Sequence, residues 1–206
     1  MNMEAESTVF VVDDDADLRE SLGWLIESAG LRVKTFSTAE EFLAGYEPEE
    51  PCCLVLDVRM PGLSGLDLQE ELTRRGVPPP IIIVTGHAKV PMAVRALKGG
   101  AIDFLQKPFS DQALLDRVRQ AIDLDRRTRQ ARAEDAKVVT LLSRLTPRER
   151  EVMDLVIAGK PNKIIADDLG ISPKTVEIHR ARVMEKMQAG SVAELVRLAL
   201  LSRRHS

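Results

Sequence analysis

The chain has 206 residues, of which 44% are hydrophobic and 30% charged, a globular composition with room for one large domain or two ordinary ones. No apolar run could cross a bilayer, and the first ten residues lack the basic and then apolar pattern of a secretory signal, so we expect a cytoplasmic protein with no membrane partner. The net charge of −3 hides two unlike halves, because residues 1–125 carry 12 Lys and Arg against 22 Asp and Glu, whereas residues 126–206 carry 17 against 10. This asymmetry predicts an acidic module that handles cations or partners, followed by a basic module suited to a polyanion.

The first half alternates short apolar runs with amphipathic helical stretches. The expected strands are residues 8–13, 31–36, 52–57, 80–85 and 101–106, and the expected helices between them are residues 16–29, 38–46, 64–75 and 91–98. Strands that are almost wholly apolar and are separated by helices indicate a parallel sheet covered on both faces. The sequence therefore predicts an α/β domain with a doubly wound parallel sheet.

Polar residues stand where four of these strands end. They are Asp13 and Asp14 after the first strand, Asp57 at the end of the third, Thr85 at the end of the fourth and Lys107 after the fifth. Ligands of an open parallel sheet bind beyond the carboxyl ends of its strands, so we expect these five side chains to converge. Neighbouring carboxylates repel one another unless a cation lies between them, and Mg2+ (or Mn2+) prefers oxygen ligands. We therefore expect Asp13, Asp14 and Asp57 to bind a metal ion.

The two remaining strand-end residues, Thr85 and Lys107, could bind a phosphate group. Thr85 can donate a hydroxyl and Lys107 an ammonium to phosphate oxygens. Asp57 then has two possible roles, metal ligand and nucleophile, since a carboxylate can accept a phosphoryl group. The tight turn that follows it would let the main-chain carbonyl of Arg59 add a metal ligand.

A single Asp, Thr or Lys at a strand end is more often structural than functional. We expect Asp15 and Asp17 to be structural, as caps of the helix that begins near residue 16, where their charges favour its positive end. The five positions above all follow the appropriate strands of one sheet, which favours a shared site.

One long stretch joins the two halves. Between Ser110 and Thr146 the sequence contains neither Gly nor Pro, and its first part has an apolar stripe that can pack on the sheet. The stretch LDRRTRQARAEDAK is mostly charged and favours a helix. It predicts that residues 125–141 form a solvated helical linker that continues the preceding helix and contributes to dimerisation.

The last 60 residues are expected to form four helices. Thr146 is a predicted N-cap with proline and glutamate after it, and Ser172 with Pro173 begins the third helix in the same way. The second and third helices are joined by the short turn at residues 170–172, which predicts a helix-turn-helix.

The third of these helices divides into two faces. Val176, Val183 and Met187, with His179 or Arg180 between them, share a face that should pack on the other helices. The outward residues suit a major groove and its flanking phosphates, and the start of the preceding helix suits a phosphate. The predicted DNA contacts are Asn162, Lys163, Lys174, Thr175, Glu177, Ile178, Ala181 and Arg182.

Four motifs of the first half resemble a known family in their order and spacing. VVDDD, VLDVRMPGLSG, VTGHA and FLQKPF are similar to the motifs of the receiver domain of two-component response regulators. The resemblance implies a flavodoxin-like domain over residues 1–124 with strand order 2-1-3-4-5. It also implies that Asp57 accepts a phosphoryl group from a sensor histidine kinase, with Mg2+ bound by Asp13, Asp14 and Asp57.

The same resemblance implies a switch. Thr85 and Lys107 would contact the phosphoryl oxygens, and Phe104 would rearrange together with Thr85 on phosphorylation. In this family the surface that changes spans the fourth helix, the fifth strand and the fifth helix, and the candidate dimer contacts on it are Val90, Met92 and Arg95.

The segment LTPREREVMDLVIAGKPNKIIADDLGISPKTVEIHRARVMEKM is similar to the LuxR-type DNA-binding domain, here residues 142–206. Its pairing with a receiver resembles the FixJ-like group of the NarL/FixJ regulators. The resemblance implies a homodimer when phosphorylated, binding to double-stranded promoter DNA and activation of transcription by RNA polymerase. The closing helix could support the dimer through Leu195, Leu198 or Val196.

Two alternatives stay open from the residues alone. An aspartate-based phosphohydrolase of the haloacid-dehalogenase kind would use Asp13 and Asp15 as paired acids, but it expects Thr or Val where Asp17 stands and gives Asp57 no role. A receiver that acts as a phosphate-independent interaction module would keep DNA binding without the switch.

Overall fold

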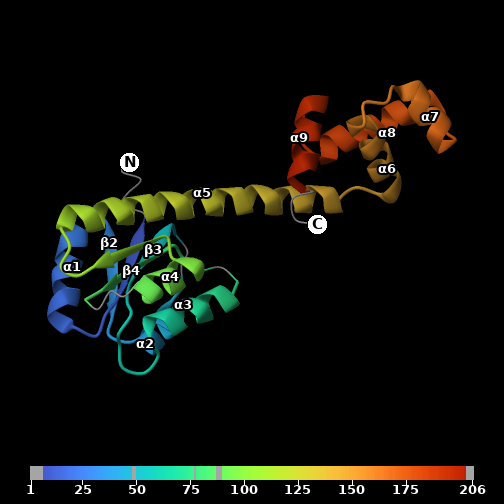
Figure 1. Cartoon of the computed structure of the whole chain (residues 1–206). Helices are drawn as coiled ribbons and strands as arrows, with labels where there is room; N and C mark the ends of the chain where they lie inside the picture. The colour runs from blue at the N-terminus through green and yellow to red at the C-terminus, as the bar shows by residue number, and fades with distance from the viewer. Residues whose placement is uncertain (1–6, 48–49, 77, 87–89, 203–206) are drawn as a thin grey trace. The chain divides into compact units, whose positions relative to one another are not determined.

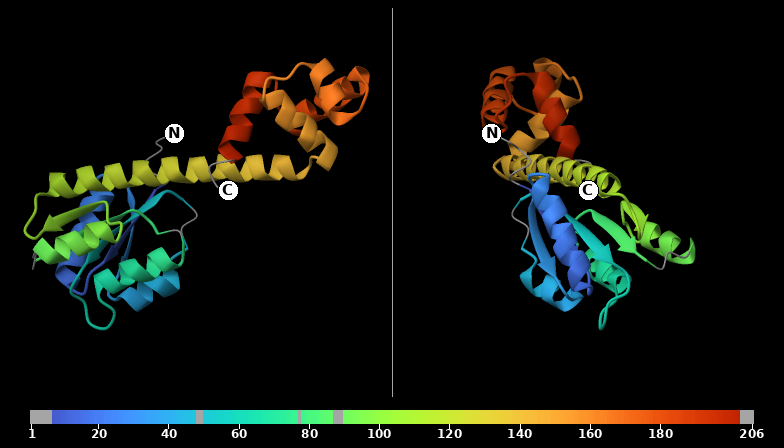
Figure 2. Two further views of the ribbon diagram at one scale, coloured as in Figure 1. Left: turned by 45° about the vertical axis from the view of Figure 1, so that its right-hand side comes forward. Right: turned by 90° about the vertical axis from the view of Figure 1, so that its left-hand side faces the viewer.

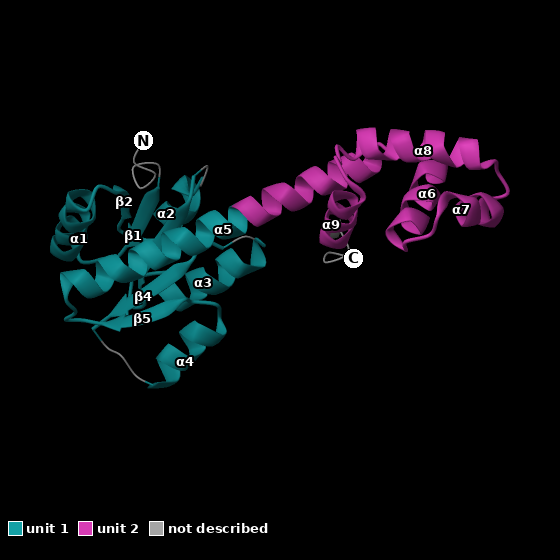
Figure 3. Cartoon of the chain, turned by 90° about the horizontal axis from the view of Figure 1, so that it is seen from above, with its two compact units in different colours: residues 1–129 teal, residues 130–206 magenta. Residues whose placement is uncertain are grey.

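The computed structural model describes residues 7–47, 50–76, 78–86 and 90–202. It forms two compact units, residues 1–129 and 130–206, which Figure 3 colours separately. His87 and Ala88, which end the motif VTGHA, lie outside the described residues. Within the described ranges, no helix is long and apolar enough to cross a membrane.

The first unit is built on a five-stranded parallel sheet. Its strands are β1 (Thr8–Val12), β2 (Arg32–Phe36), β3 (Cys52–Asp57), β4 (Ile81–Thr85) and β5 (Asp103–Gln106). They lie in the order β2-β1-β3-β4-β5 and all pair in parallel, which confirms the predicted fold. Every residue of the central strand β3 is buried, as expected for a sheet covered on both faces.

The fifth strand begins later than predicted, at Asp103 instead of residue 101. Gly100 N donates to Leu97 O over 3.1 Å and Ala101 N donates to Ala96 O over 3.0 Å. These amides satisfy carbonyls at the end of the preceding helix, with Gly100 at φ +97° in the left-handed region that such a helix end requires. Residues 100 and 101 therefore end a helix instead of beginning a strand.

Helices cover both faces of this sheet (Figures 1 and 2). They are α1 (Ala16–Ser28), α2 (Ala39–Gly45), α3 (Gly65–Arg74), α4 (Val90–Lys98) and α5 (Asp111–Ser143). Successive side chains of a strand point to opposite faces, so the neighbours Val11 and Val12 lie in different core clusters. Val11 packs with residues of α1 and α5, whereas Val12 packs with residues of α2, α3 and α4.

The helix α1 begins as predicted. Asp15 is its N-cap, and the Asp15 side chain accepts hydrogen bonds from the main-chain N–H groups of Asp17 and Leu18. Asp17 lies in the first turn, where its charge favours the positive end of the helix. Both acids therefore serve the start of this helix.

The long helix α5 runs through the predicted linker at residues 125–141. The linker is not wholly solvated as expected, because Asp125, Val138 and Leu141 are buried. Asp125 Oδ2 accepts from Cys52 N over 2.9 Å and from Arg129 Nε over 2.6 Å. A buried strand end needs a partner for its first N–H, and this acid supplies it, so α5 is tied to the sheet as far as Arg129.

The second unit contains the four predicted helices. They are α6 (Pro147–Ile157), α7 (Asn162–Leu169), α8 (Pro173–Lys186) and α9 (Val192–Ser202). Thr146 and Ser172 cap α6 and α8 through their side chains, and Gly170 ends α7 in the left-handed conformation with φ +64°. Val176, Val183 and Met187 are buried in the core of this unit, which confirms the predicted inward face of α8.

A buried carboxylate joins two helices of this core. Glu149 is 2% exposed, accepts from Thr146 N over 2.9 Å in a capping box, and also accepts from Lys186 Nζ over 2.6 Å. The hydrogen bond from Lys186, and those of Thr146, lower the pKa of Glu149 from 4.5 to about 2. The carboxylate thus stabilises the fold mainly in its ionised form.

We expect Glu149→Gln to lower the free energy of unfolding by about 1–3 kcal/mol, because Lys186 and the helix start are left without a charged acceptor. A lowered folded-state pKa means that the stabilisation is present above about pH 4.5 and is lost as the pH falls toward 2. Chemical denaturation at several pH values should therefore show a smaller acid destabilisation in the variant than in the unaltered chain. Glu151→Gln is the matched control, since Glu151 is exposed and pairs only with Arg148 among the ion pairs described, and it should change stability by less than about 0.5 kcal/mol. Equal losses of stability in the two variants would contradict the role of Glu149.

Candidate functional site

Four of the five predicted strand-end residues lie together at the carboxyl edge of the sheet. Lys107 Nζ lies 2.7 Å from Asp13 Oδ2 and 3.1 Å from Asp57 Oδ1, so one ammonium joins acids from the ends of two different strands. Asp13 and Asp57 are only 3% and 6% exposed, and Thr85 is buried at the end of β4. The sheet places β1, β3, β4 and β5 side by side and in parallel, which is why residues distant in the sequence become neighbours.

The two oxygens of Asp57 have different partners. Oδ1 faces Lys107, whereas Oδ2 accepts from the main-chain N–H of Arg59 over 2.6 Å. Burial raises the pKa of the Asp57 carboxyl above its usual value, although Lys107 and the Arg59 N–H both favour the ionised form. Burial works against the charge of Lys107, but its contacts with Asp13 and Asp57 leave the pKa of this ammonium raised. The site therefore holds partly desolvated carboxylates beside a fixed positive charge.

Asp13 is held in place by its own loop. Its Oδ1 accepts from Asp15 N over 3.0 Å, and its main-chain carbonyl accepts from Arg19 Nη1 over 2.7 Å. Asp14, the next residue, is exposed. Across the described ranges, no three His, Cys, Asp or Glu residues are grouped closely enough to hold a metal ion by themselves, so the three-acid metal site stays a prediction.

The pair of buried carboxylates fits a hard cation of the Mg2+ kind. Mg2+ prefers oxygen ligands, keeps several of its waters, and is commonly bound through one or two carboxylates together with phosphate oxygens. Asp13 and Asp57 present such carboxylates to a shared positive charge, the ammonium of Lys107. The oxygen donors of Asp13 and Asp57 are therefore of the type that Mg2+ prefers, and the residues present fit such an ion.

The predicted switch residues lie on adjacent strands. Thr85 ends β4, and its carbonyl accepts from Lys107 N over 3.0 Å. Phe104, in β5, is half-buried and packs against the core cluster that includes Ala96 of α4. The peptide bond between Lys107 and Pro108 is cis.

Gly65 is a residue of this site that the sequence patterns did not predict. A Cβ atom at this position would lie 2.0 Å from the main-chain oxygen of Asp57 and 3.0 Å from its carbonyl carbon. Gly65 N also donates to Val58 O over 3.0 Å, which closes the loop that follows Asp57. Gly65 begins α3, so the absent side chain lets this helix approach the backbone of Asp57. Its place at the end of MPGLSG is the only signal in the sequence.

The predicted DNA contacts divide by exposure. Lys163, Lys174, Glu177, Ile178, Ala181 and Arg182 are exposed, whereas Asn162 and Thr175 are half-buried. The Thr175 hydroxyl lies 2.8 Å from that of Ser172 at the cap of α8, and Asn162 Oδ1 accepts from Arg180 Nη1 over 2.8 Å. Contact with DNA stays a prediction for the whole set.

The predicted dimer contacts differ in their surroundings. Val90 is 79% exposed and is followed on α4 by the exposed side chains of Val94 and Leu97, at the spacing of one helical face. Met92 is partly buried against the core, and Arg95 forms ion pairs with Asp67 and Glu70 of α3.

The dimer contact predicted at Leu195 is wrong for this fold. Leu195 is 1% exposed and lies in the core of the second unit, and Leu198 is partly buried against the same core. The apolar stripe of α9 is used within the unit, because a short four-helix domain must bury such a stripe against its own helices. The exposed apolar side chains of α9 are Val192 and Leu200.

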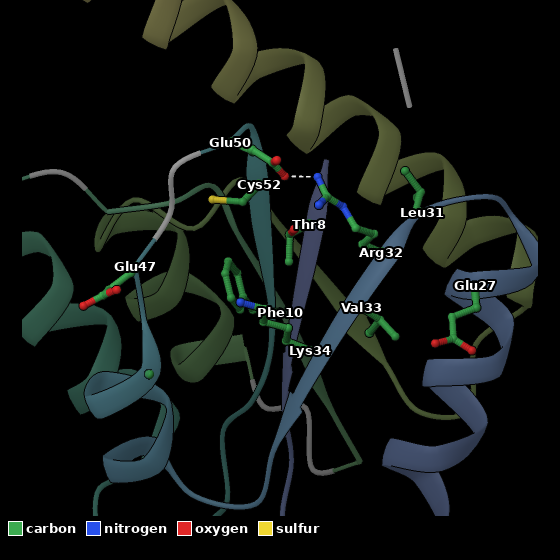
Figure 4. A pocket seen from close by; sticks show the side chains of 11 residues that line it. Thr8, Phe10, Glu27, Leu31, Arg32, Val33, Lys34, Glu47, Glu50 and Cys52 are labelled. Atoms are coloured by element: carbon green, nitrogen blue, oxygen red, sulfur yellow. Dashed lines mark hydrogen bonds and ion pairs between the residues drawn. The ribbon is translucent and has the colours of Figure 1, made fainter. Parts of the chain in front are cut away.

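A cavity of about 710 Å³ lies in the first unit near the beginnings of β1, β2 and β3 (Figure 4). Phe10 and Val33 line it, and its charged side chains have both signs, with Arg32 paired to Glu50. A lining of mixed charge indicates no particular ligand, and none of the predicted strand-end residues lines this cavity.

Two family descriptions match the chain. The description "Response regulator receiver domain" matches residues 9–119, and "Bacterial regulatory proteins, luxR family" matches residues 143–199. The first covers more than half of the chain, and the two together span both compact units.

Characterised proteins resemble the chain over nearly its full length. Nodulation protein W of Bradyrhizobium diazoefficiens is 50% identical over 94% of this chain and 86% of its own. Transcriptional regulatory protein FixJ of Azorhizobium caulinodans is 50% identical over 94% of this chain and 92% of its own. A solved structure of response regulator StyR has a TM-score of 0.88 at 49% identity, covering 94% of this chain and 98% of that one. Full-length FixJ from B. japonicum has a TM-score of 0.58 at 44% identity, covering 96% and 97%.

Proposed function

The chain belongs to the FixJ-like response regulators of two-component systems, and we propose that phosphorylation of Asp57 controls its binding to promoter DNA. A receiver domain joined to a LuxR-type DNA-binding domain makes it a phosphorylation-dependent transcriptional regulator. It is a regulator and not an enzyme in the ordinary sense. The observation that supports Asp57 as the acceptor is the shared ammonium of Lys107, which lies within reach of both Asp13 and Asp57.

The phosphoryl transfer itself needs little from the chain beyond position and charge. One oxygen of Asp57 attacks the phosphorus of a phosphohistidine on the sensor kinase, and the bond from phosphorus to the imidazole nitrogen breaks with its electron pair on nitrogen. Lys107 carries a positive charge beside the reacting carboxylate, where it can stabilise the added negative charge. The Arg59 N–H holds the second oxygen and so orients the carboxyl group.

Receiver domains typically use Mg2+ for this reaction, and we propose that Asp13 and Asp57 hold the ion here. Asp14 and the main-chain carbonyl of Arg59 are the further oxygen donors of the proposed set, and Mn2+ would suit the same ligands. When bound, the cation offsets the charge of the carboxylates and of the phosphoryl oxygens. Because the cation offsets this negative charge, two desolvated carboxylates can lie beside an anionic phosphoryl group.

The switch that we propose connects this edge of the sheet to α4. A phosphoryl group on Asp57 adds acceptor oxygens that can draw in Thr85 and Lys107, and Phe104 can follow Thr85. The side chain of Phe104 packs against a cluster that includes a residue of α4, so its movement would alter the surface of that helix. The exposed face with Val90, Val94 and Leu97 is the surface that we propose for a phosphorylation-dependent homodimer.

In the second unit we propose that α8 lies in the major groove of promoter DNA. Lys174 and Arg182 would contact phosphates or bases, and activation would follow from recruitment of RNA polymerase. The cognate sensor kinase is the proposed source of the phosphoryl group. A phosphohydrolase that uses Asp13 and Asp15 as paired acids is not supported, because Asp15 is the N-cap of α1, where its side chain accepts from the main-chain N–H groups of Asp17 and Leu18.

Salt dependence of DNA binding tests the contacts of α8. We expect Arg182→Ala and Lys174→Ala each to weaken binding to a duplex in fluorescence anisotropy, and to reduce the slope of log K against log salt by about 0.9 for each phosphate that the side chain neutralises. Lys137→Ala, an exposed lysine of the same unit outside the proposed surface, is the control and should leave the slope unchanged.

Binding should also tighten when an acyl phosphate and Mg2+ are added to the unaltered chain. Unchanged affinity with phosphodonor would overturn the switch, whereas unchanged slopes in both variants would overturn the proposed surface.

A further inference from the structure

Arg180 occupies an unusual position for a charged residue. Val176, Arg180, Val183 and Met187 follow one another at spacings of four, three and four residues, which places Arg180 on the inward face of α8. The three apolar members are buried, and Arg180 itself is half-buried. It is therefore separate from the outward set that includes Lys174 and Arg182, and a charge on this inward face needs a partner.

The partner is Asn162, the first residue of α7. Arg180 Nη1 donates to Asn162 Oδ1 over 2.8 Å. A guanidinium group can only donate hydrogen bonds, so this contact decides which atom of the amide turns toward Arg180. The oxygen of Asn162 is engaged there, and its NH2 group is left to face an acceptor outside this pair.

The orientation of the Asn162 amide decides whether its NH2 group or its oxygen faces a phosphate. Phosphate oxygens are acceptors, so an amide that presents NH2 attracts a phosphate and an amide that presents its oxygen repels it. Asn162 begins α7, whose N-cap Pro161 contributes no side-chain hydrogen bond, and exposed Lys163 follows it. The start of this helix therefore offers donors and positive charge in one place.

We propose that Arg180 is a positioning residue for DNA binding, which orients the Asn162 amide so that it donates to a backbone phosphate. The inference rests on the proposed contact between Asn162 and DNA, and it gives Arg180 an indirect role. Because Arg180 is on α8 and Asn162 on α7, the hydrogen bond between them also fixes the start of one helix against the other.

The first test compares two substitutions of Asn162 by anisotropy with a DNA duplex. We expect Asn162→Ala to weaken binding about threefold to tenfold, the worth of one net hydrogen bond. Asn162→Asp should weaken it further, because the carboxylate keeps the Arg180 contact but turns an oxygen toward the phosphate. Thermal unfolding should show that Asn162→Asp is at least as stable as the unaltered chain. If Asn162→Asp binds as well as the unaltered chain, the contact is structural only and the inference fails.

The second test asks whether Arg180 acts through Asn162. We expect Arg180→Ala to weaken DNA binding to the same degree as Asn162→Ala, and the double variant to bind no more weakly than either single variant. The salt slope of Arg180→Ala should match that of the control Arg197→Ala. Arg197 is an exposed arginine of α9, outside the proposed surface, so it corrects for the removal of one charge. A slope lower by about 0.9 for Arg180→Ala would mean a direct phosphate contact and would overturn the inference, as would multiplicative weakening in the double variant. If Asn162→Ala alone has no effect, the proposed Asn162 contact fails, which is a different outcome from failure of Arg180.

Discussion

Replacing Asp57 with Asn is expected to abolish phosphorylation of this chain. In a mixture with a radiolabelled acyl phosphate and Mg2+, the unaltered chain should acquire a label that survives acid and is lost in base, as an aspartyl phosphate does. The carboxamide that Asp57→Asn introduces is too weak a nucleophile to take the phosphoryl group, yet it has nearly the shape of the carboxylate and can still accept from the Arg59 N–H. The variant should therefore fold, and it should fail to tighten its DNA binding when phosphodonor is added.

A second carboxylate near the site provides the control. Asp17 lies in the first turn of α1 and is exposed, so Asp17→Asn should keep the label at the level of the unaltered chain. Thermal unfolding of both variants would exclude loss of fold as the cause. A label that survives Asp57→Asn would remove the phosphoacceptor role from this residue and with it the proposed switch.

Replacing Gly65 with Ala is expected to have the second largest effect. The added methyl group would lie 2.0 Å from the main-chain oxygen of Asp57, far inside any contact distance, so α3 or the Asp57 backbone must move. Overpacking of this kind typically costs about 1–3 kcal/mol of stability. A displacement of the nucleophile by about 1 Å can slow a reaction on the order of 100-fold, so phosphorylation should slow far more than the loss of stability explains.

The control for this variant is another glycine of the same unit. Gly23 lies inside α1, and a Cβ there would meet no described atom within 4 Å. Gly23→Ala should raise stability by about 0.5–1 kcal/mol, because alanine favours a helix interior, and should leave the phosphorylation rate unchanged. Both variants would be followed by the rate of label uptake and by denaturant unfolding. A normal rate in Gly65→Ala would show that the close approach of α3 does not position Asp57.

Much of the fold is predictable because it depends on patterns that are local in the sequence. Apolar runs such as the one ending at Asp57, each followed by an amphipathic stretch, require a covered parallel sheet, and in such a sheet polar strand ends must share one edge. Asp15 can be recognised as a cap from its place before a helical pattern, and the same pattern locates Thr146 and Ser172. These features are decided by neighbours within a few residues.

Other features depend on which surfaces meet, and a single sequence does not contain that information. Leu195 lies on an apolar stripe that could serve either a dimer or the core of its own unit, and the structure buries it in that core. Asp125 stands in a charged stretch that suggests solvent, whereas the first N–H of β3 requires its carboxylate.

The phosphorylation site combines both kinds of feature. Strand periodicity and strand-end position alone are enough to group Asp13, Asp57 and Lys107, because the carboxyl ends of parallel strands share one edge. Three features emerge only from the folded chain. They are the sharing of Lys107 between the two acids, the need for Gly65 to lack a side chain and the hydrogen bond from Arg180 to Asn162. Each of these three outcomes depends on distances between segments that the sequence separates, and those distances are set by packing and not by local pattern.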